Sequence, residues 1–155
     1  MPVCIICDRL RELHLSLNEY RSVELPATRT FPSVKSFFFN SNAVTQWSEV
    51  QRLGRAFPRL ESLVMMSNPL SEFTSKTADG KEQGAAGGLV DSARADFPCL
   101  KSLNVSRTPI KSWEAVDELR QFPQLVDVRL HSITCAEVIG SEITGLLCQI
   151  LCVIF

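Results

Sequence analysis

Residues 60–70, LESLVMMSNPL, contain the pattern that decides the fold of this chain. The pattern is LxxLxLxxNxL, and it falls here on Leu60, Leu63, Met65, Asn68 and Leu70. Alternate residues of an extended segment point to opposite sides, so residues 63 and 65 are expected to face a core and residue 64 to face away from it. The stretch therefore predicts a short strand that is apolar on one side.

Four further copies of this pattern occur along the chain. They are LRELHLSLN from residue 10, VKSFFFNSNAV from residue 34, LKSLNVSRTPI from residue 100 and the shorter LVDVRL from residue 125. Because one unit cannot bury its own apolar side, the copies are expected to stack on one another. Asparagine at the end of a strand can bond to backbone groups where the chain turns, and Thr108, which replaces it in one copy, can do part of this with its hydroxyl.

The segments that join the strands also resemble one another. Phe-Pro precedes four of the five copies, at Phe31, Phe57, Phe97 and Phe122, and is expected to end a helix and return the chain to an extended backbone. In residues 44–60 and 110–125, apolar residues recur in steps of three on one predicted helical face: Trp47, Val50 and Leu53, and Trp113, Val116 and Leu119. Ser112 is the expected N-cap of the second helix, with acidic Glu114 in its first turn.

These patterns predict an α/β leucine-rich repeat solenoid, a horseshoe with a short parallel β-sheet on its concave face and helices on its convex face. The predicted strands are residues 13–15, 37–39, 63–65, 103–105 and 128–130. The repeat array is assigned to residues 10–133, with a flexible, glycine-rich insertion at 74–88, an irregular segment at 1–9 and an apolar tail at 134–155. Neither end resembles a polar cap, so we expect an incomplete array, either a fragment or a splice product.

Composition and charge narrow the classes of partner. The chain has 155 residues, of which 45% are apolar and 21% charged, as in an ordinary folded domain. Sixteen basic and seventeen acidic residues give a formal charge of −1, so neither nucleic acid nor an acidic membrane surface is an expected partner. Residues 139–155 are apolar but short for a membrane span and include Glu142, so we expect a buried or uncapped end, with a span as the alternative.

No catalytic, metal or cofactor site is predicted. Cys4 and Cys7 form CxxC, half of a zinc site by spacing, but no second pair with comparable spacing follows. All six cysteines are interpreted as reduced thiols. His14 and His131 belong to the first and last predicted strands, too far apart for one active site. Residues 80–88, GKEQGAAGG, lack the order of a phosphate-binding loop.

The concave face is the predicted binding surface for a protein. Its outward residues are His14, Ser16, Phe38, Asn40, Val64, Met66, Asn104, Ser106, Arg129 and His131. Phe38, Val64 and Met66 form an apolar centre with polar residues around it, a composition typical of protein contact sites. The alternative is that the insertion or the apolar tail covers this centre.

Three segments resemble a known family. LRELHLSLNEY, FPRLESLVMMSNPL and SWEAVDELRQFPQLVDVRL are similar to the repeats of the tubulin-specific chaperone cofactor E-like family, and next to those of tubulin folding cofactor E, over residues 8–133 except 74–88. The resemblance implies a cytoplasmic, cytoskeleton-associated protein that binds α/β-tubulin and affects microtubule stability, without catalysis by the repeats. The ubiquitin-like domain of that family is absent from this sequence. The alternatives are a leucine-rich repeat adaptor for another protein and a truncated product without independent function.

Overall fold

The computed structural model describes residues 9–22, 25, 29–73 and 97–134. Its elements, in chain order, are β1 (Glu12–His14), β2 (Ser36–Phe38), α1 (Trp47–Ala56), β3 (Ser62–Val64), β4 (Ser102–Asn104), α3 (Trp113–Asp117), the 3-10 helix η1 (Glu118–Gln121) and β5 (Asp127–Arg129). The predicted insertion at 74–88 and the tail from residue 135 onward lie outside the described residues, as do Cys4 and Cys7. Neither described helix is long and apolar enough to cross a membrane.

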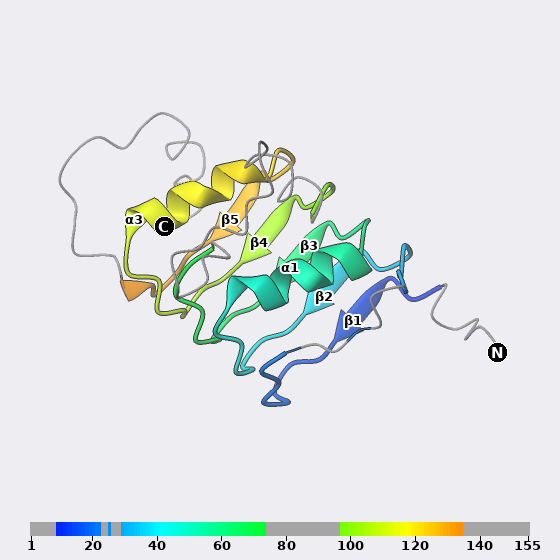
Figure 1. Ribbon diagram of the computed structural model, residues 1–155, viewed down its shortest axis with the longest axis horizontal. Coiled ribbons are helices and arrows are strands. Elements are labelled where there is room, and N and C mark those ends of the chain that lie inside the picture. Colours follow the sequence, from blue (N-terminus) through cyan, green and yellow to red (C-terminus); the bar gives the residue numbers. More distant parts are fainter. Residues whose placement is uncertain (1–8, 23–24, 26–28, 74–96, 135–155) are drawn as a thin grey trace, which may run out of the picture.

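The strands form one parallel sheet in the order β1-β2-β3-β4-β5, so neighbours in the sequence are neighbours in space. Helices α1 and α3 both lie on the same side of this sheet (Figure 1). The α/β class and the predicted strand order are confirmed. Each strand begins one residue before its predicted start, and the backbone hydrogen bonds continue beyond it, for example from Phe39 N to Val64 O at 2.7 Å.

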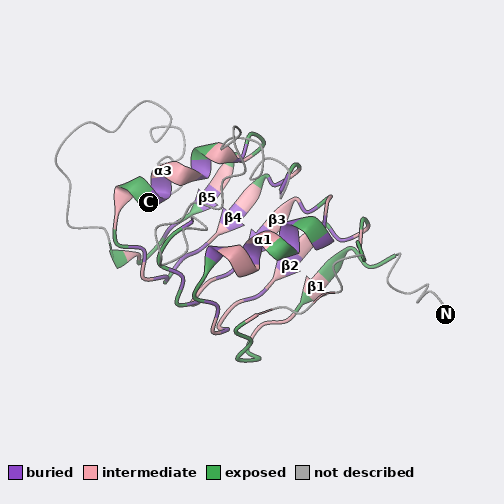
Figure 2. Cartoon of the chain, viewed as in Figure 1, coloured by how far each residue is buried: buried purple, intermediate pink, exposed green. Residues whose placement is uncertain are grey.

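The predicted alternation decides which side chains enter the core. Phe37, Phe39, Leu63, Met65, Leu103 and Val105 are each 0% exposed and point toward the helices. Leu13 of β1, an edge strand of the described sheet, and Leu15 just after it are only partly buried, and Figure 2 shows β1 as the most exposed strand.

The two helices bury the predicted face but differ in form. Trp47, Val50 and Leu53 of α1 are each 1% exposed. Ser112 caps α3, with its hydroxyl accepting a hydrogen bond from Ala115 N at 3.2 Å. After five residues α3 continues as the tighter η1, which carries Leu119. From Ile110 to Leu125 there are 15 residue steps against 16 from Val44 to Leu60, and a 3-10 helix spans a given length with fewer residues because it rises about 2.0 Å per residue rather than 1.5 Å.

Aromatic rings fill the space between sheet and helices. The ring of Trp47 meets those of Phe73, Phe122 and Phe97 at centroid distances of 5.2, 6.0 and 6.3 Å. The Phe-Pro phenylalanines therefore do more than end a segment, because Phe97 and Phe122 pack on a helix that belongs to an earlier copy. Trp113, the counterpart of Trp47, is only partly buried.

Buried asparagine amides join the second and third copies to the copy before them. Asn68 Nδ2 donates to Phe39 O of the preceding copy at 2.9 Å and to Met65 O of its own at 3.0 Å, and its Oδ1 accepts from Val44 N at 3.4 Å. Asn42 makes the same pair of contacts one copy earlier. Thr108 bonds only to its own copy, at Val105 O, because its hydroxyl has one proton to donate.

The residue before each asparagine position has a left-handed backbone. The equivalent residues Leu17, Ser41, Ser67, Arg107 and Ser132 have φ between 53° and 63°. Glycine favours this region, and none of the five positions holds it. The turn is maintained by the ladder, since Ser67 N donates to Ser106 O at 3.0 Å and Arg107 N to His131 O at 2.8 Å.

We predict that Asn68→Ala lowers the free energy of unfolding by about 3 kcal/mol, because buried backbone groups left unpaired cost about 1–3 kcal/mol each. Asn18 is the matched control, since within the described residues its exposed side-chain amide donates to Ser16 O alone. Urea unfolding measures both variants. A loss for Asn18→Ala as large as that for Asn68→Ala would contradict the bridging role.

We also predict that Ser67→Val destabilises the fold by about 1–2 kcal/mol more than Ser67→Gly, because a branched side chain is strained at φ of 57°. Ser62→Val, in the extended strand β3, is the control and should be tolerated. Thermal unfolding followed by circular dichroism tests the order, and equal midpoints for the two Ser67 variants would refute it.

Candidate functional site

The side of the sheet opposite α1 and α3, called here the open face, carries the predicted binding residues in rows. The strand register aligns His14, Phe38, Val64, Asn104 and Arg129 across all five strands as one row. A second row, two residues further along each copy, contains Ser16, Asn40, Met66, Ser106 and His131. Because the copies stack in register, each row contains the residues that occupy one equivalent position in the five copies.

An apolar patch occupies the centre of the open face. Phe38 and Val64 are register partners, and Met66 follows Val64 on the same side of the chain. All three are half-buried, neither packed in the core nor fully in solvent. His14 of β1 stacks on Phe38, with ring centroids 4.2 Å apart and ring planes 8° apart, and so extends the flat apolar surface toward the first strand.

The polar residues of the second row serve the sheet itself. Ser16 Oγ accepts from Asn40 N at 3.1 Å, Asn40 Oδ1 accepts from Met66 N at 3.1 Å, and Ser106 Oγ accepts from His131 N at 3.2 Å. Ser106 is 3% exposed. The structure therefore leaves Ser106 little surface for a partner, and it ties Ser16 and Asn40 to cross-strand bonds.

The methionine interrupts this arrangement. A thioether is a poor hydrogen-bond acceptor, and Met66 makes no such bond to the next copy within the described residues. Ser106 N instead donates to Asn104 Oδ1 at 3.1 Å. Asn104 is thus also engaged with the backbone, whereas the apolar side chains of Phe38, Val64 and Met66 can take no such polar role.

A third row on the open face was missing from the predicted set. It comprises Glu12, Ser36, Ser62, Ser102 and Asp127, which are register partners at the start of the strands. Two-residue alternation alone would have found them, because each lies two residues before a predicted residue. Ser102 Oγ donates to Asp127 Oδ2 at 2.9 Å, and Arg129 Nη2 lies 3.5 Å from the same oxygen.

In the described part of the chain, the titratable side chains of the open face are spread across the sheet. His14 belongs to β1 and His131 follows β5, at opposite ends of the described sheet, as predicted. Among the described residues, no three histidine, cysteine or acidic side chains gather into a set that could hold a metal ion. What this surface offers chemically is a flat apolar centre within a polar border, suited to contact with another protein.

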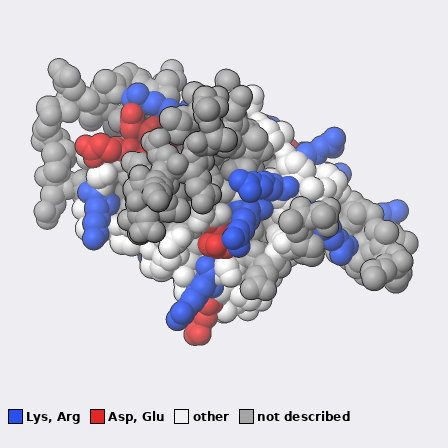
Figure 3. Space-filling view, in the orientation of Figure 1, with Lys and Arg blue, Asp and Glu red and all other residues white. Residues whose placement is uncertain are grey.

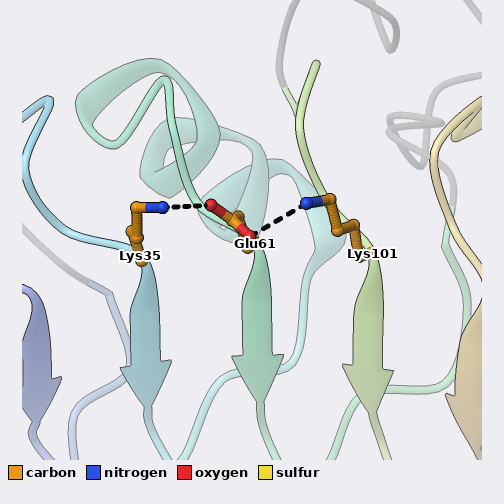
Figure 4. Close-up of polar contacts among 3 residues, drawn as sticks. All are labelled: Lys35, Glu61 and Lys101. Carbon is orange, nitrogen blue, oxygen red and sulfur yellow. Dashed lines mark hydrogen bonds and ion pairs between the residues drawn. The ribbon is translucent and has the colours of Figure 1, made fainter.

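A charged row crosses the sheet just before the strands begin. This strand-start row consists of Arg11, Lys35, Glu61, Lys101 and Val126. Glu61 Oε1 lies 2.6 Å from Lys35 Nζ, and its Oε2 lies 3.0 Å from Lys101 Nζ, so the carboxylate joins three neighbouring copies (Figure 4). Hydrogen bonds from Lys35 and Lys101 and their positive charges lower the pKa of Glu61 from its ordinary 4.5 to about 2.

Several known proteins are similar to this chain in sequence, although no protein-family model matches it. The tubulin-specific chaperone cofactor E-like protein of Rattus norvegicus is 34% identical to it over 124 residues, which are 80% of this chain and 26% of the rat protein. The resemblance to these proteins is confirmed.

Two further relatives agree with this finding. The Homo sapiens protein of the same name is 33% identical over 124 residues, with the same two coverages. The tubulin-folding cofactor E of Arabidopsis thaliana is 32% identical over 124 residues, covering 78% of this chain and 22% of the plant protein. The chain thus spans about a quarter of the length of the cofactor E-like relatives it matches.

We predict that the Glu61 carboxyl titrates near pH 2 by nuclear magnetic resonance, and that Lys101→Met moves this midpoint toward 4.5. Because the pKa is lower in the folded chain, the contribution of Glu61 to stability is present above pH 4.5 and is lost as the pH falls toward 2. The side chain is 32% exposed, so added salt should raise the midpoint as well. Lys111→Met, an exposed lysine elsewhere, is the control, and an ordinary midpoint in the native chain would contradict the three-way contact.

Proposed function

We propose that this chain is a leucine-rich repeat solenoid that serves as a protein-binding scaffold in tubulin chaperoning. The observation that carries the proposal is the apolar patch of Phe38, Val64 and Met66 in the centre of a rigid, otherwise polar sheet face. Relatives named as tubulin-specific chaperone cofactors support a tubulin-related partner. The partner proposed here is α/β-tubulin.

Binding would act through desolvation of the patch. Aromatic and methionine side chains remove apolar area from water on contact, and buried apolar anchors of this kind supply much of the affinity at interface centres. The bonds from Ser16 and Asn40 to neighbouring strands hold this surface in place before a partner arrives. Such preorganisation lowers the entropy cost of binding.

The proposed role is non-catalytic and cytoplasmic, in association with the cytoskeleton, with an effect on microtubule stability through bound tubulin. A scaffold of this kind needs no cofactor, since its function is to present a surface. Its specificity would come from the match between the patch and its polar border and the partner's surface.

We predict that Phe38→Glu and Met66→Glu each weaken capture of purified αβ-tubulin by at least about tenfold, the change expected for a contact worth about 1.4 kcal/mol. A charge placed in the centre of the contact would be buried without a partner. Pull-down with the complete immobilised chain, followed by titration of tubulin, measures the effect.

Val126→Glu is the matched control, because Val126 is 74% exposed and lies outside the patch. It introduces the same charge and should leave tubulin capture unchanged, while urea unfolding confirms that all variants fold. Equal capture by all variants would refute the open face as the site. Failure of the native chain to capture tubulin would refute the partner and favour an adaptor for another protein.

A further inference from the structure

The strand-start edge of β1 and β2 gathers positive charge through the stacking of equivalent positions. Lys35 N and Ser36 N both donate to Arg11 O, at 2.7 and 3.0 Å, so the strand-start row brings Arg11 beside Lys35. Arg9 and Arg59 occupy the position two residues earlier in their own copies, with Ser33 between them in the same row. Two rows of the repeat therefore converge on one place.

A hollow of about 560 Å³ opens at that place, lined by Arg9, Arg11, Pro32, Ser33, Lys35 and Arg59. We call it the basic hollow. Of the six described residues that line it, four are cationic and none is acidic, although the whole chain has a formal charge of −1. Among the charged side chains visible on the right-hand side of Figure 3, near β1, lysine and arginine predominate, whereas basic and acidic side chains adjoin near the helices.

The charges of this hollow are only partly balanced. Lys35 contacts Glu61, but that carboxylate also serves Lys101 on the far side. Within the described part of the chain, none of the ion pairs involves the guanidinium group of Arg9, Arg11 or Arg59. Neighbouring strands lie about 4.8 Å apart, so cations stacked on them repel one another, and a bound anion would relieve that repulsion.

We propose that the basic hollow binds a carboxylate-rich segment of a partner protein. Guanidinium groups match carboxylates because two parallel N–H groups can each donate to one oxygen. Among the described lining residues, none is an aromatic side chain on which a nucleic acid base could stack, and Pro32 alone is apolar, which is too little to enter a lipid surface. An acidic peptide is the ligand class that needs only what the hollow has, which is several arginines and an open, polar wall.

This site is distinct from the apolar patch of the open face, and it does not depend on tubulin being the partner. None of Phe38, Val64 and Met66 lines the hollow. A protein that contacts the open face could place an acidic segment across the edge of the sheet and so engage both surfaces. The two sites would then add their binding free energies through one partner.

Fluorescence anisotropy with a labelled oligoglutamate peptide and the complete chain tests the proposal, with an oligoglutamine peptide of equal length as the uncharged comparison. We expect oligoglutamate to bind, oligoglutamine not to bind, and added salt to weaken binding. Arg11→Glu and Arg59→Glu should each reduce the affinity by about tenfold or more. Arg21→Glu is the matched control, because Arg21 is exposed beyond the opposite end of β1 and gives the same change in net charge.

Three results would overturn the proposal. These are no binding of oligoglutamate to the native chain, an equal loss with Arg21→Glu, and tighter binding of polyuridylate or phosphatidylserine vesicles than of oligoglutamate. Tubulin capture by the same variants separates this inference from the proposed function. Failure with oligoglutamate while Phe38→Glu still abolishes tubulin capture would remove the hollow and keep the open face.

Discussion

The amide side chains of Asn42 and Asn68 hold the first three copies at a constant offset, and the backbone hydrogen bonds between strands continue that offset through the last two. Each amide has two protons and an oxygen, which is enough to donate to carbonyls of its own copy and of the previous one while accepting from a third backbone group. These groups lie where the strands end and would otherwise be buried without partners. Once the copies are held in this register, each residue lies beside the equivalent residues of the neighbouring copies. Equivalent residues therefore form rows across the sheet.

Rows explain why the surfaces differ although they share one scaffold. The row of Phe37 and its inward counterparts is uniformly apolar because it faces the helices, so its residues are interchangeable among phenylalanine, leucine and valine. The outward rows are free of that demand, and each copy contributes a different side chain to them. An apolar centre on the open face and a cluster of cations at the strand starts can therefore coexist on adjacent strands without disturbing the core.

Most of the scaffold could be predicted from the sequence because it follows from short-range periodicity. The inward residues of the strands, the buried face of Trp47, Val50 and Leu53, and the cap at Ser112 are each encoded within a few residues. The left-handed residues could not be predicted, because serine, leucine and arginine occupy them in place of glycine and the constraint comes from the neighbouring strand. The basic hollow could not be predicted for a similar reason, because the sequence does not show that Arg9, Arg11 and Arg59 lie close together until the strand register is known. For the candidate site, the apolar centre was visible as a composition, whereas the structural duties of Ser106 and Asn104 required the hydrogen bonds.

Met66 shows the structural cost of placing an apolar residue in this row. At the same position, Ser16, Asn40 and Ser106 each accept a hydrogen bond from the next copy, and the thioether of Met66 does not replace that bond within the described residues. At this step in the middle of the sheet, the two copies are joined by backbone hydrogen bonds and by the ion pair of Glu61 with Lys101. The apolar patch therefore gains Met66 at a position where a serine or asparagine would have formed a side-chain hydrogen bond to the next copy.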